Sequence, residues 1–353
     1  MNIFDDEDDA FVGTPKSNYF SIAKTANQNI VEMELDKMFR RFAVAEKILE
    51  EKGLEEEHEQ LMRAMVIDKE LDDRYVASLY QKLPHGKRLR TKLILKIAGH
   101  DLKVVKTAAT VEMIHAASLL HDDVIDDANT RRGKVSVNAS EGNKTAIMLG
   151  DILYSKAFFE LTSISPEVAK VVSNAVVQLS LGELADVELS KQFHTDREAY
   201  LKMLYQKTAS LMEASAEAAA ILSGKPREVY RHYGRNLGIA FQMIDDILDI
   251  TADSETLGKP ALHDFVEGKV TLPYIYLYEA LAEEDRDYLV SLHRKRLSQD
   301  ESAWIKVAMQ KYDIVEKSYS EAKELVLEAI ALMESRGEKD LSNIAKAMIE
   351  REF

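Results

Sequence analysis

From about residue 18 to the C-terminus, apolar residues recur at spacings of three and four, and no stretch shows the alternation of a half-buried strand. Proline and glycine, for example Pro166 and Gly224, fall mostly between or near the ends of these periodic segments, which divides the chain into at least about ten helices. We therefore predict an all-α fold with one helical domain over residues 18–353. Residues 1–17 combine an acidic run with a glycine and a proline, which predicts a disordered acidic N-terminus.

The acidic balance of the chain limits its partners. The formal charge is −15, so the sequence predicts no nucleic-acid partner, and a polyanionic substrate would be repelled unless local cations or metal ions intervene. The chain has no cysteine, which excludes disulfides, thiolate metal sites and a cysteine nucleophile. The acidic N-terminus is unlike a signal peptide, and no apolar run reaches the roughly 18–20 residues of a spanning helix. We expect a cytoplasmic protein without stable membrane insertion.

One polar line runs along an otherwise apolar helix predicted over residues 107–127. His115, Ser118, Asp122 and Asp126 follow one another at steps of three, four and four, so they share one face. The apolar residues around them indicate that the helix is buried within the bundle. Buried carboxylates must be paired or bound to cations.

The segment 236–253 repeats this design with Gln242, Asp245 and Asp249. A lone Asp-Asp-x-x-Asp cluster can equally be a solvated helix end, but two clusters in matched apolar helices favour facing carboxylates that bind Mg²⁺. Bound Mg²⁺ would reverse the local charge and let an acidic protein hold a diphosphate.

Basic residues placed around the two clusters favour phosphate binding. Arginine clasps phosphate oxygens in a bidentate fork, and lysine adds a point charge. Each of these residues alone would more often be a solvated surface charge. They indicate phosphate binding only in combination with one another and with the two aspartate clusters. The basic candidates are Lys87, Arg90, Arg131, Arg132, Lys207, Lys259 and Lys269.

These motifs together resemble the trans-isoprenyl diphosphate synthase (polyprenyl synthetase) family over about residues 80–275. The matching segments are 121–126 with 131–133 for the first aspartate motif, 242–249 for the second, and 258–259 with 267–273 beyond it. The resemblance implies a single-domain orthogonal helical bundle of the isoprenoid synthase type around a central cavity. It also implies a prenyltransferase that condenses isopentenyl diphosphate head-to-tail with an allylic diphosphate, uses about three Mg²⁺ ions and forms a homodimer.

The resemblance assigns roles to particular residues. Metal binding falls to Asp122, Asp123, Asp126, Asp245, Asp246 and Asp249, with Asp264 as a possible contributor. The allylic diphosphate would meet Arg131, Lys207, Lys259 and Lys269, and isopentenyl diphosphate would meet Lys87, Arg90, His115 and Arg132. The catalytic residues implied are Lys207, Thr208 and Gln242, which surround the ionising bond.

Chain length is expected to depend on the residues one turn before Asp122. Short-chain members of the resembled family typically have a bulky aromatic there, whereas this chain has Ala117 and Ser118, so we expect an open tunnel. The expected product has about thirty to forty-five carbons, as in a quinone side chain, and we expect membrane enzymes to receive it. The candidates for the tunnel floor are Met113, Ile114, Phe158 and Phe159. A short-chain synthase and a non-catalytic subunit of a prenyl synthase are the alternatives.

Two departures from the family pattern and three rival functions complete the interpretation. His85 and Thr91 stand where the family commonly has glycine and proline, and His263 stands where it commonly has an acid. A di-iron bundle would use Glu112-x-x-His115 and the Glu-x-x-His at 55–58, but the latter segment is polar all round. A phosphohydrolase using a His-Asp pair at 121–122 would leave the second aspartate cluster idle. Terpene cyclases and head-to-head synthases share the fold but need no isopentenyl diphosphate site.

Overall fold

The computed structural model describes residues 76, 78–79, 82–83, 88–251 and 261–349. These residues lie within one compact unit of the chain, Lys69–Phe353. The acidic segment 1–17 and the predicted domain boundary at residue 18 lie outside the described residues, as do Lys87 and Lys259.

The described residues are almost entirely helical, which confirms the predicted fold class. Two-residue strands form a single hairpin among them. In chain order the elements are α4 (Leu89–Ala98), α5 (Leu102–Ile125), β1 (Thr130–Arg131), β2 (Lys134–Val135), α6 (Val137–Glu141), α7 (Asn143–Ile164), α8 (Pro166–Leu189), α9 (Arg197–Leu204), the π-helical turn η2 (Tyr205–Ala209), α10 (Ser210–Ser223), α11 (Arg227–Thr251), α13 (His263–Glu267), α14 (Leu272–Ala280), α15 (Glu283–Leu292), α16 (Gln299–Lys311), α17 (Ile314–Glu334) and α18 (Lys339–Ile349).

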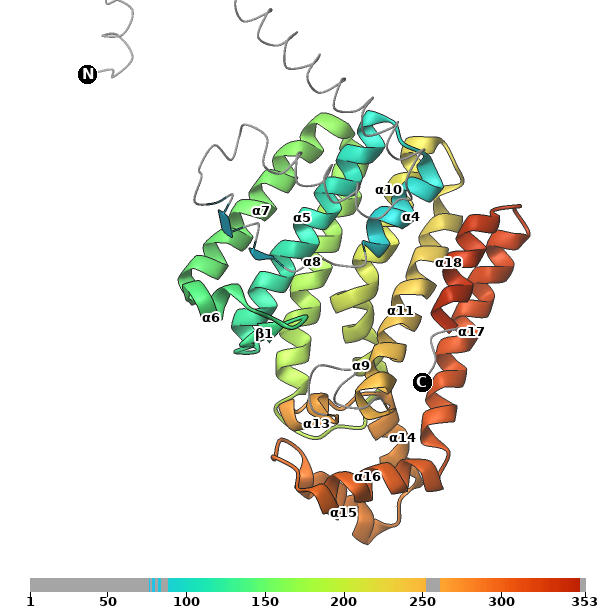
Figure 1. Ribbon diagram of the computed structural model, residues 1–353. Coiled ribbons are helices and arrows are strands. Elements are labelled where there is room, and N and C mark those ends of the chain that lie inside the picture. The colour runs from blue at the N-terminus through green and yellow to red at the C-terminus, as the bar shows by residue number, and fades with distance from the viewer. Residues whose placement is uncertain (1–75, 77, 80–81, 84–87, 252–260, 350–353) are drawn as a thin grey trace, which may run out of the picture. The chain divides into compact units, whose positions relative to one another are not determined.

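Long helices that run side by side form the centre of the described unit (Figure 1). Helix α10 packs against α4, α8 and α11, while α5 packs against α7 and α4. Helix α17 covers α11 and carries α18, and α15 and α16 cross the lower end of the bundle in Figure 1. Both aspartate stripes therefore lie on helices that other helices surround.

Helix α5 shows why its sequence lacks the two-sided pattern of a surface helix. The Asp101 side chain caps its N-terminus by accepting the Val104 N–H at 3.0 Å. Residues on all sides of its first four turns are buried, so an apolar circumference is what its place in the core requires. Asp126 ends the helix as its C-cap, which puts the first stripe at the carboxyl end of α5.

The β1–β2 hairpin is the local structure that the periodicity did not predict. Thr130 pairs with Val135 and Arg131 with Lys134, so Arg132 and Gly133 form a two-residue turn. Both turn residues have positive φ, 52° and 74°, as a type I′ turn requires. Strands of two residues are too short to show alternating polarity, so Gly133 in the turn is the one residue whose type indicates a hairpin in the sequence.

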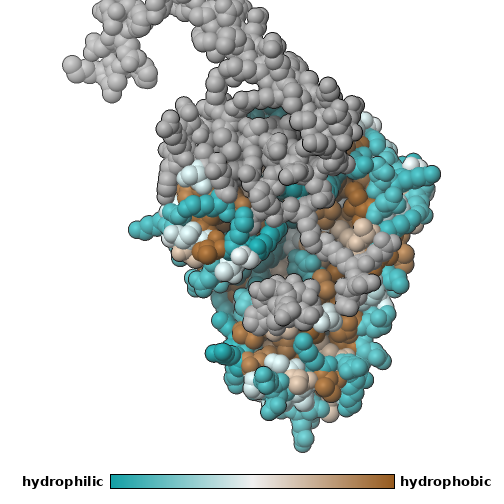
Figure 2. Space-filling view, in the orientation of Figure 1, coloured by the Kyte–Doolittle hydropathy of each residue, from teal (hydrophilic) through white to brown (hydrophobic). Residues whose placement is uncertain are grey.

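The outer surface of the C-terminal helices is largely polar. In Figure 2 polar side chains prevail along the right-hand edge and at the lower tip, over α15–α18. Within the described part of the chain, no helix has the length and apolarity needed to cross a membrane.

Candidate active site

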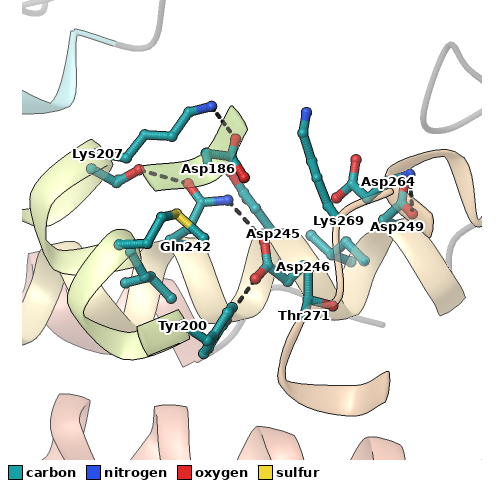
Figure 3. A pocket seen from close by; sticks show the side chains of 14 residues that line it. Asp186, Tyr200, Lys207, Gln242, Asp245, Asp246, Asp249, Asp264, Lys269 and Thr271 are labelled. Carbon is teal, nitrogen blue, oxygen red and sulfur yellow. Dashed lines mark hydrogen bonds and ion pairs between the residues drawn. The ribbon is translucent and has the colours of Figure 1, made fainter. Parts of the chain in front are cut away.

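A cavity of about 370 Å³ lies between α8, α9, η2, α11 and the segment that leads from α13 to α14. Figure 3 shows the side chains that converge on it. Predicted metal, allylic-site and catalytic residues meet in this cavity. Its lining consists of Asp186, Tyr200, Met203, Leu204, Lys207, Thr208, Gln242, Asp245, Asp246, Leu248, Asp249, Asp264, Lys269 and Thr271.

The π-helical turn η2, which carries Lys207 and Thr208, is held between two glycines. A Cβ on Gly182 of α8 would lie 2.3 Å from the Lys207 backbone nitrogen, and a Cβ on Gly238 of α11 would lie 2.5 Å from Ala209 Cα. Any larger residue at either glycine would push the turn away. Single-turn π-bulges of this kind often occur at functional sites. The close approach of three backbones thus positions Lys207 and Thr208.

The Lys207 ammonium binds two carboxylates of α8. Its Nζ lies 2.5 Å from Asp186 Oδ2 and 2.9 Å from Glu183 Oε2. Burial alone would lower the pKa of Lys207, but Asp186 and then Glu183 outweigh burial and raise it, so the ammonium stays charged. Sequence reasoning missed both acids. Their signal was Glu183-x-x-Asp186 directly after a glycine on a helix with an otherwise apolar inner face.

Lys269 approaches the first aspartate motif from the opposite side. Its Nζ lies 3.9 Å from Asp126 Oδ2 and 2.8 Å from Glu267 Oε2. Burial opposes its charge, but Asp126 and the other acids nearby raise the pKa of Lys269. Lys269 therefore lies near the first aspartate motif, and its role at the allylic site stays a prediction.

The three aspartates of the first motif have different surroundings. Burial, followed by repulsion from Glu183, raises the pKa of Asp122 to about 7, so this carboxylate lacks a sufficient counter-charge. Like Asp122 and Asp126, Asp123 is not among the residues that line this cavity, and it accepts a hydrogen bond from Arg131 Nε at 2.5 Å. Arg131 therefore anchors the hairpin to α5 in this structure, and the metal role of Asp123 and the phosphate role of Arg131 stay predictions.

A hydrogen-bonded chain orders the second motif (Figure 3). Thr208 Oγ1 donates to Gln242 Oε1 at 2.9 Å, and Gln242 Nε2 donates to Asp246 Oδ1 at 2.9 Å. Tyr200 Oη donates to the other carboxylate oxygen of Asp246 at 2.6 Å. Burial, followed by repulsion from Asp264, raises the pKa of Asp246 to about 8. Asp246 thus orients Gln242 and Thr208, and both Asp245 and Asp246 line the cavity.

Asp249 links the second motif to α13. Its Oδ2 accepts the Asp264 N–H at 3.1 Å, and its backbone carbonyl accepts the Leu262 N–H at 2.9 Å. Asp264 lines the cavity, whereas His263 forms an ion pair with Glu267 at 2.9 Å. The metal role of Asp264 stays a prediction.

Three of the four residues predicted for isopentenyl diphosphate are described: Arg90 at the start of α4, His115 on α5 and Arg132 in the hairpin. Arg90 is half-buried, and its Nε is inaccessible to solvent and finds no hydrogen-bond partner among the described residues. Burial, followed by repulsion from Arg90 and then Arg132, lowers the pKa of His115 well below its usual value, so the imidazole is neutral. Arg132 stands in the left-handed backbone region at a φ of 52°, a strained conformation of the kind found at binding sites.

The chain-length candidates lie on the same helix. Ala117 is fully buried, and Ser118 Oγ donates to the His115 carbonyl at 2.9 Å. Met113 and Ile114 are buried as well, so both remain candidates for the tunnel floor. The suggestion of Phe159 is wrong, because this side chain is 59% exposed on α7.

The structure argues against two rival functions. His121 packs against α7, where its Nε2 lies 3.2 Å from the Ile147 carbonyl and 3.5 Å from Asp151 Oδ1, so it does not join Asp122 at a metal. Glu112 of the Glu-x-x-His motif accepts hydrogen bonds from Arg88 and Thr91 instead of facing a metal centre.

The donors around the cavity suit Mg²⁺ that binds together with phosphate. In the described part of the chain, no three His, Asp or Glu side chains form a complete metal site by themselves. Mg²⁺ usually takes one or two protein carboxylates and completes its shell with phosphate oxygens and water. Glu183 Oε1 is buried without a hydrogen-bond partner among the described residues, and Asp122 lacks a sufficient counter-charge. Both observations fit a site that a cation completes.

A helical bundle that gathers carboxylates and lysines in one cavity, with an arginine cluster nearby, defines a class of α-helical enzymes that handle diphosphates. Residues 73–310 match the sequence model of the family described as Polyprenyl synthetase. The chain belongs to this family and is a prenyltransferase of the polyprenyl diphosphate synthase type. Residues 11–80 match a second model, a domain of unknown function named DUF2018.

Individual relatives agree with this assignment. The short chain isoprenyl diphosphate synthase of Methanothermobacter thermautotrophicus is 34% identical, over 76% of this chain and 87% of its own. The crystal structure of octaprenyl pyrophosphate synthase from Helicobacter pylori superposes with a TM-score of 0.80 at 40% identity, covering 84% of this chain and 100% of that chain. The crystal structure of polyprenyl synthase from Caulobacter crescentus, complexed with calcium and isoprenyl diphosphate, superposes with a TM-score of 0.77 at 28% identity. The match covers 88% of this chain and 97% of that chain.

Proposed function

We propose that this enzyme condenses isopentenyl diphosphate with an allylic diphosphate, head-to-tail and in the trans configuration, at the cavity lined by Asp245, Lys207 and Lys269. The observation that carries the proposal is the presence of two separate anion environments. One combines carboxylates with lysines and suits a metal-bridged diphosphate, and the other is an arginine cluster that needs no metal. A head-to-tail condensation needs this difference, because only one of its two diphosphates leaves.

The allylic diphosphate is proposed to bind with Mg²⁺ held by Asp122, Asp126 and Asp245, and about three ions are expected. When bound, Mg²⁺ supplies the positive charge that stabilises the departing diphosphate. Glu183 and Asp186, which bind the Lys207 ammonium, lie close enough to it to contribute to Mg²⁺ binding through water. The other acids assigned to the metal shell, which stay predictions, are Asp123, Asp246, Asp249 and Asp264.

The chain's own side chains would act on the charges that develop. Lys207 and Lys269 bring fixed ammonium groups to the diphosphate, joined by Arg131 and Lys259 in the predicted set. The Thr208 hydroxyl donates to Gln242, so its lone pairs and the Gln242 carbonyl can face the allylic cation that ionisation leaves. The isopentenyl double bond attacks this cation, and the released diphosphate takes the final proton. Exclusion of water protects the cation from capture.

Isopentenyl diphosphate is proposed to bind Lys87, Arg90, Arg132 and His115. The guanidinium groups would clasp its phosphates, and the neutral imidazole can donate a hydrogen bond without adding charge. The buried Arg90 Nε supports this assignment, since a bound anion would satisfy it.

The proposed product is an all-trans polyprenyl diphosphate of about thirty to forty-five carbons, made possible by the small side chains at Ala117 and Ser118. The similarity to an octaprenyl synthase supports this range, and the similarity to a short chain synthase keeps the short-chain alternative open.

A homodimer is proposed through the outer face of α7 and α8. These helices contact each other and expose large apolar side chains, including Leu184 at 68%. A second copy of the same face would cover such a patch in an isologous interface. The exposed apolar residues on this face are Ile147, Met148, Phe159, Val177, Leu181, Leu184 and Val187.

Incubation with radiolabelled isopentenyl diphosphate, an allylic primer and Mg²⁺ tests the function directly. The expected result is a ladder of prenyl diphosphates whose formation stops in excess chelator. A product made from the allylic primer alone would indicate a cyclase, and a product that retains no isopentenyl label would overturn the proposal.

A further inference from the structure

Glu112 is a buried acid to which the reaction assigns no role. It lies on α5, one turn before His115, and is 3% exposed. Its Oε2 accepts a hydrogen bond from Arg88 Nη1 at 2.9 Å, and its Oε1 accepts one from Thr91 Oγ1 at 2.8 Å. The Thr91 backbone N–H also points to Oε1, at 3.4 Å. Glu112 therefore ties the first turn of α4 to α5 through both carboxylate oxygens.

The link from Glu112 to the first turn of α4 matters for diphosphate binding, because this turn carries Arg88 and Arg90. Arg88 is the N-cap of α4 and has a left-handed backbone, with a φ of 49° and a ψ of 38°, which costs a non-glycine residue about 1 kcal/mol or more. Its bond to Glu112 helps to hold this conformation, and the conformation sets the direction in which Arg90 enters the helix. Arg90 is half-buried and its Nε is inaccessible to solvent, so its guanidinium has limited freedom to correct a misplaced backbone.

Thr91 contributes two hydrogen-bond donors to this link between α4 and α5. The resembled family commonly has proline at this place, and proline carries neither a hydroxyl nor a backbone N–H. Thr91 supplies both donors to Glu112, and it is itself 1% exposed. The threonine that replaces the family's usual proline at position 91 thus adds two hydrogen bonds to the Glu112 carboxylate.

We propose that Glu112 and Thr91 are positioning residues that hold the α4 arginines in the geometry that binds the diphosphate of isopentenyl diphosphate. This inference rests on the proposed function of the arginine cluster. An alternative role for Glu112 is that of a counter-charge that merely lowers the positive charge of Arg88, Arg90 and Arg132. The two roles predict opposite results, because removal of a mere counter-charge would strengthen the binding of an anion, whereas removal of a positioning group would weaken it.

The test is Glu112→Gln, which keeps the size of the side chain and removes its charge. We expect the KM for isopentenyl diphosphate to rise by about tenfold or more, since a hydrogen bond to a charged group is lost. The KM for the allylic diphosphate should change by less than about twofold, because its site lies on other elements. Thr91→Val should raise the first KM by a smaller factor, and Thr91→Ser, which keeps the hydroxyl, should restore it.

Matched controls make each outcome decisive. Glu217 of α10 is also a buried acid paired with an arginine, Arg227, but it faces α11, so Glu217→Gln should leave both KM values unchanged. Arg90→Ala tests the site itself, and if it fails to raise the KM for isopentenyl diphosphate selectively, the proposed function of the cluster is wrong. If Arg90→Ala has that effect while Glu112→Gln lowers this KM or leaves it unchanged, the positioning role alone is overturned. Thr91→Val decides the question in the same way if Glu112→Gln does not fold.

Discussion

Replacing Gly182 by alanine should disable the allylic site without changing the side chain of any residue assigned to substrate binding. The added Cβ would lie 2.3 Å from the Lys207 nitrogen, whereas ordinary van der Waals contact begins at 3.4 Å. The turn that carries Lys207 and Thr208 must then move by about 1 Å, and a displacement of that size can cost about a hundredfold in rate. The overpacking itself should cost about 1–3 kcal/mol of stability.

Steady-state and single-turnover kinetics can separate these effects. We expect Gly182→Ala to lower kcat by about a hundredfold, with the KM for isopentenyl diphosphate nearly unchanged because its arginine cluster lies on α4, α5 and the hairpin. Ser180→Ala, an exposed substitution on the same helix, serves as the control and should behave as the parent protein. A Gly182→Ala protein with parental kcat and parental Tm would refute the reasoning that Gly182 positions Lys207.

Four further predictions concern the metal, pH, product length and assembly. Asp122→Asn and Asp245→Asn should each lower turnover by several orders of magnitude while the far-UV circular dichroism stays unchanged, and full activity in either variant would contradict the metal assignment. In chelator, the free energy of unfolding should fall as pH rises from about 4 to about 8. Burial above all raises the pKa of Asp122 to about 7 and that of Asp246 to about 8. The folded state therefore binds these two protons more tightly than the unfolded chain does. Tm scans that rise with pH would contradict this. Ala117→Tyr should shorten the product to about fifteen or twenty carbons in chromatography, whereas a lowered Tm with unchanged product length would mean that no open tunnel lies beside this residue. Leu184→Glu should shift the protein from dimer to monomer in analytical ultracentrifugation, and an unchanged dimer would place the interface elsewhere.

The sequence predicted the helical fold and the two aspartate stripes because both depend on periodicity within one helix. His115, Asp122 and Asp126 share a face whatever α5 packs against, so spacing alone suffices for them. The same logic predicted the stripe of Gln242, Asp245 and Asp249 on α11.

Contacts between helices could not be predicted in this way. Nothing in the spacing of α8 indicates that Gly182 meets the Lys207 backbone, or that Glu183 and Asp186 bind the Lys207 ammonium. Asp123 looked equivalent to Asp122, yet it pairs with Arg131, because the hairpin folds back onto that side of α5. Roles that depend on the direction of a side chain required the tertiary structure.

The two anion environments also explain how an acidic chain can treat two diphosphates differently. Around the cavity, Lys207 and Lys269 are already paired with carboxylates, so a diphosphate there must bring further cations with it. In the arginine cluster, Glu112 offsets only part of the charge of Arg88, Arg90 and Arg132, so a diphosphate can bind there directly. In the proposed mechanism, metal ions held with the first diphosphate would make it a good leaving group, and a second diphosphate bound without metal would keep its C–O bond intact. The direction of the condensation then follows from where the carboxylates lie.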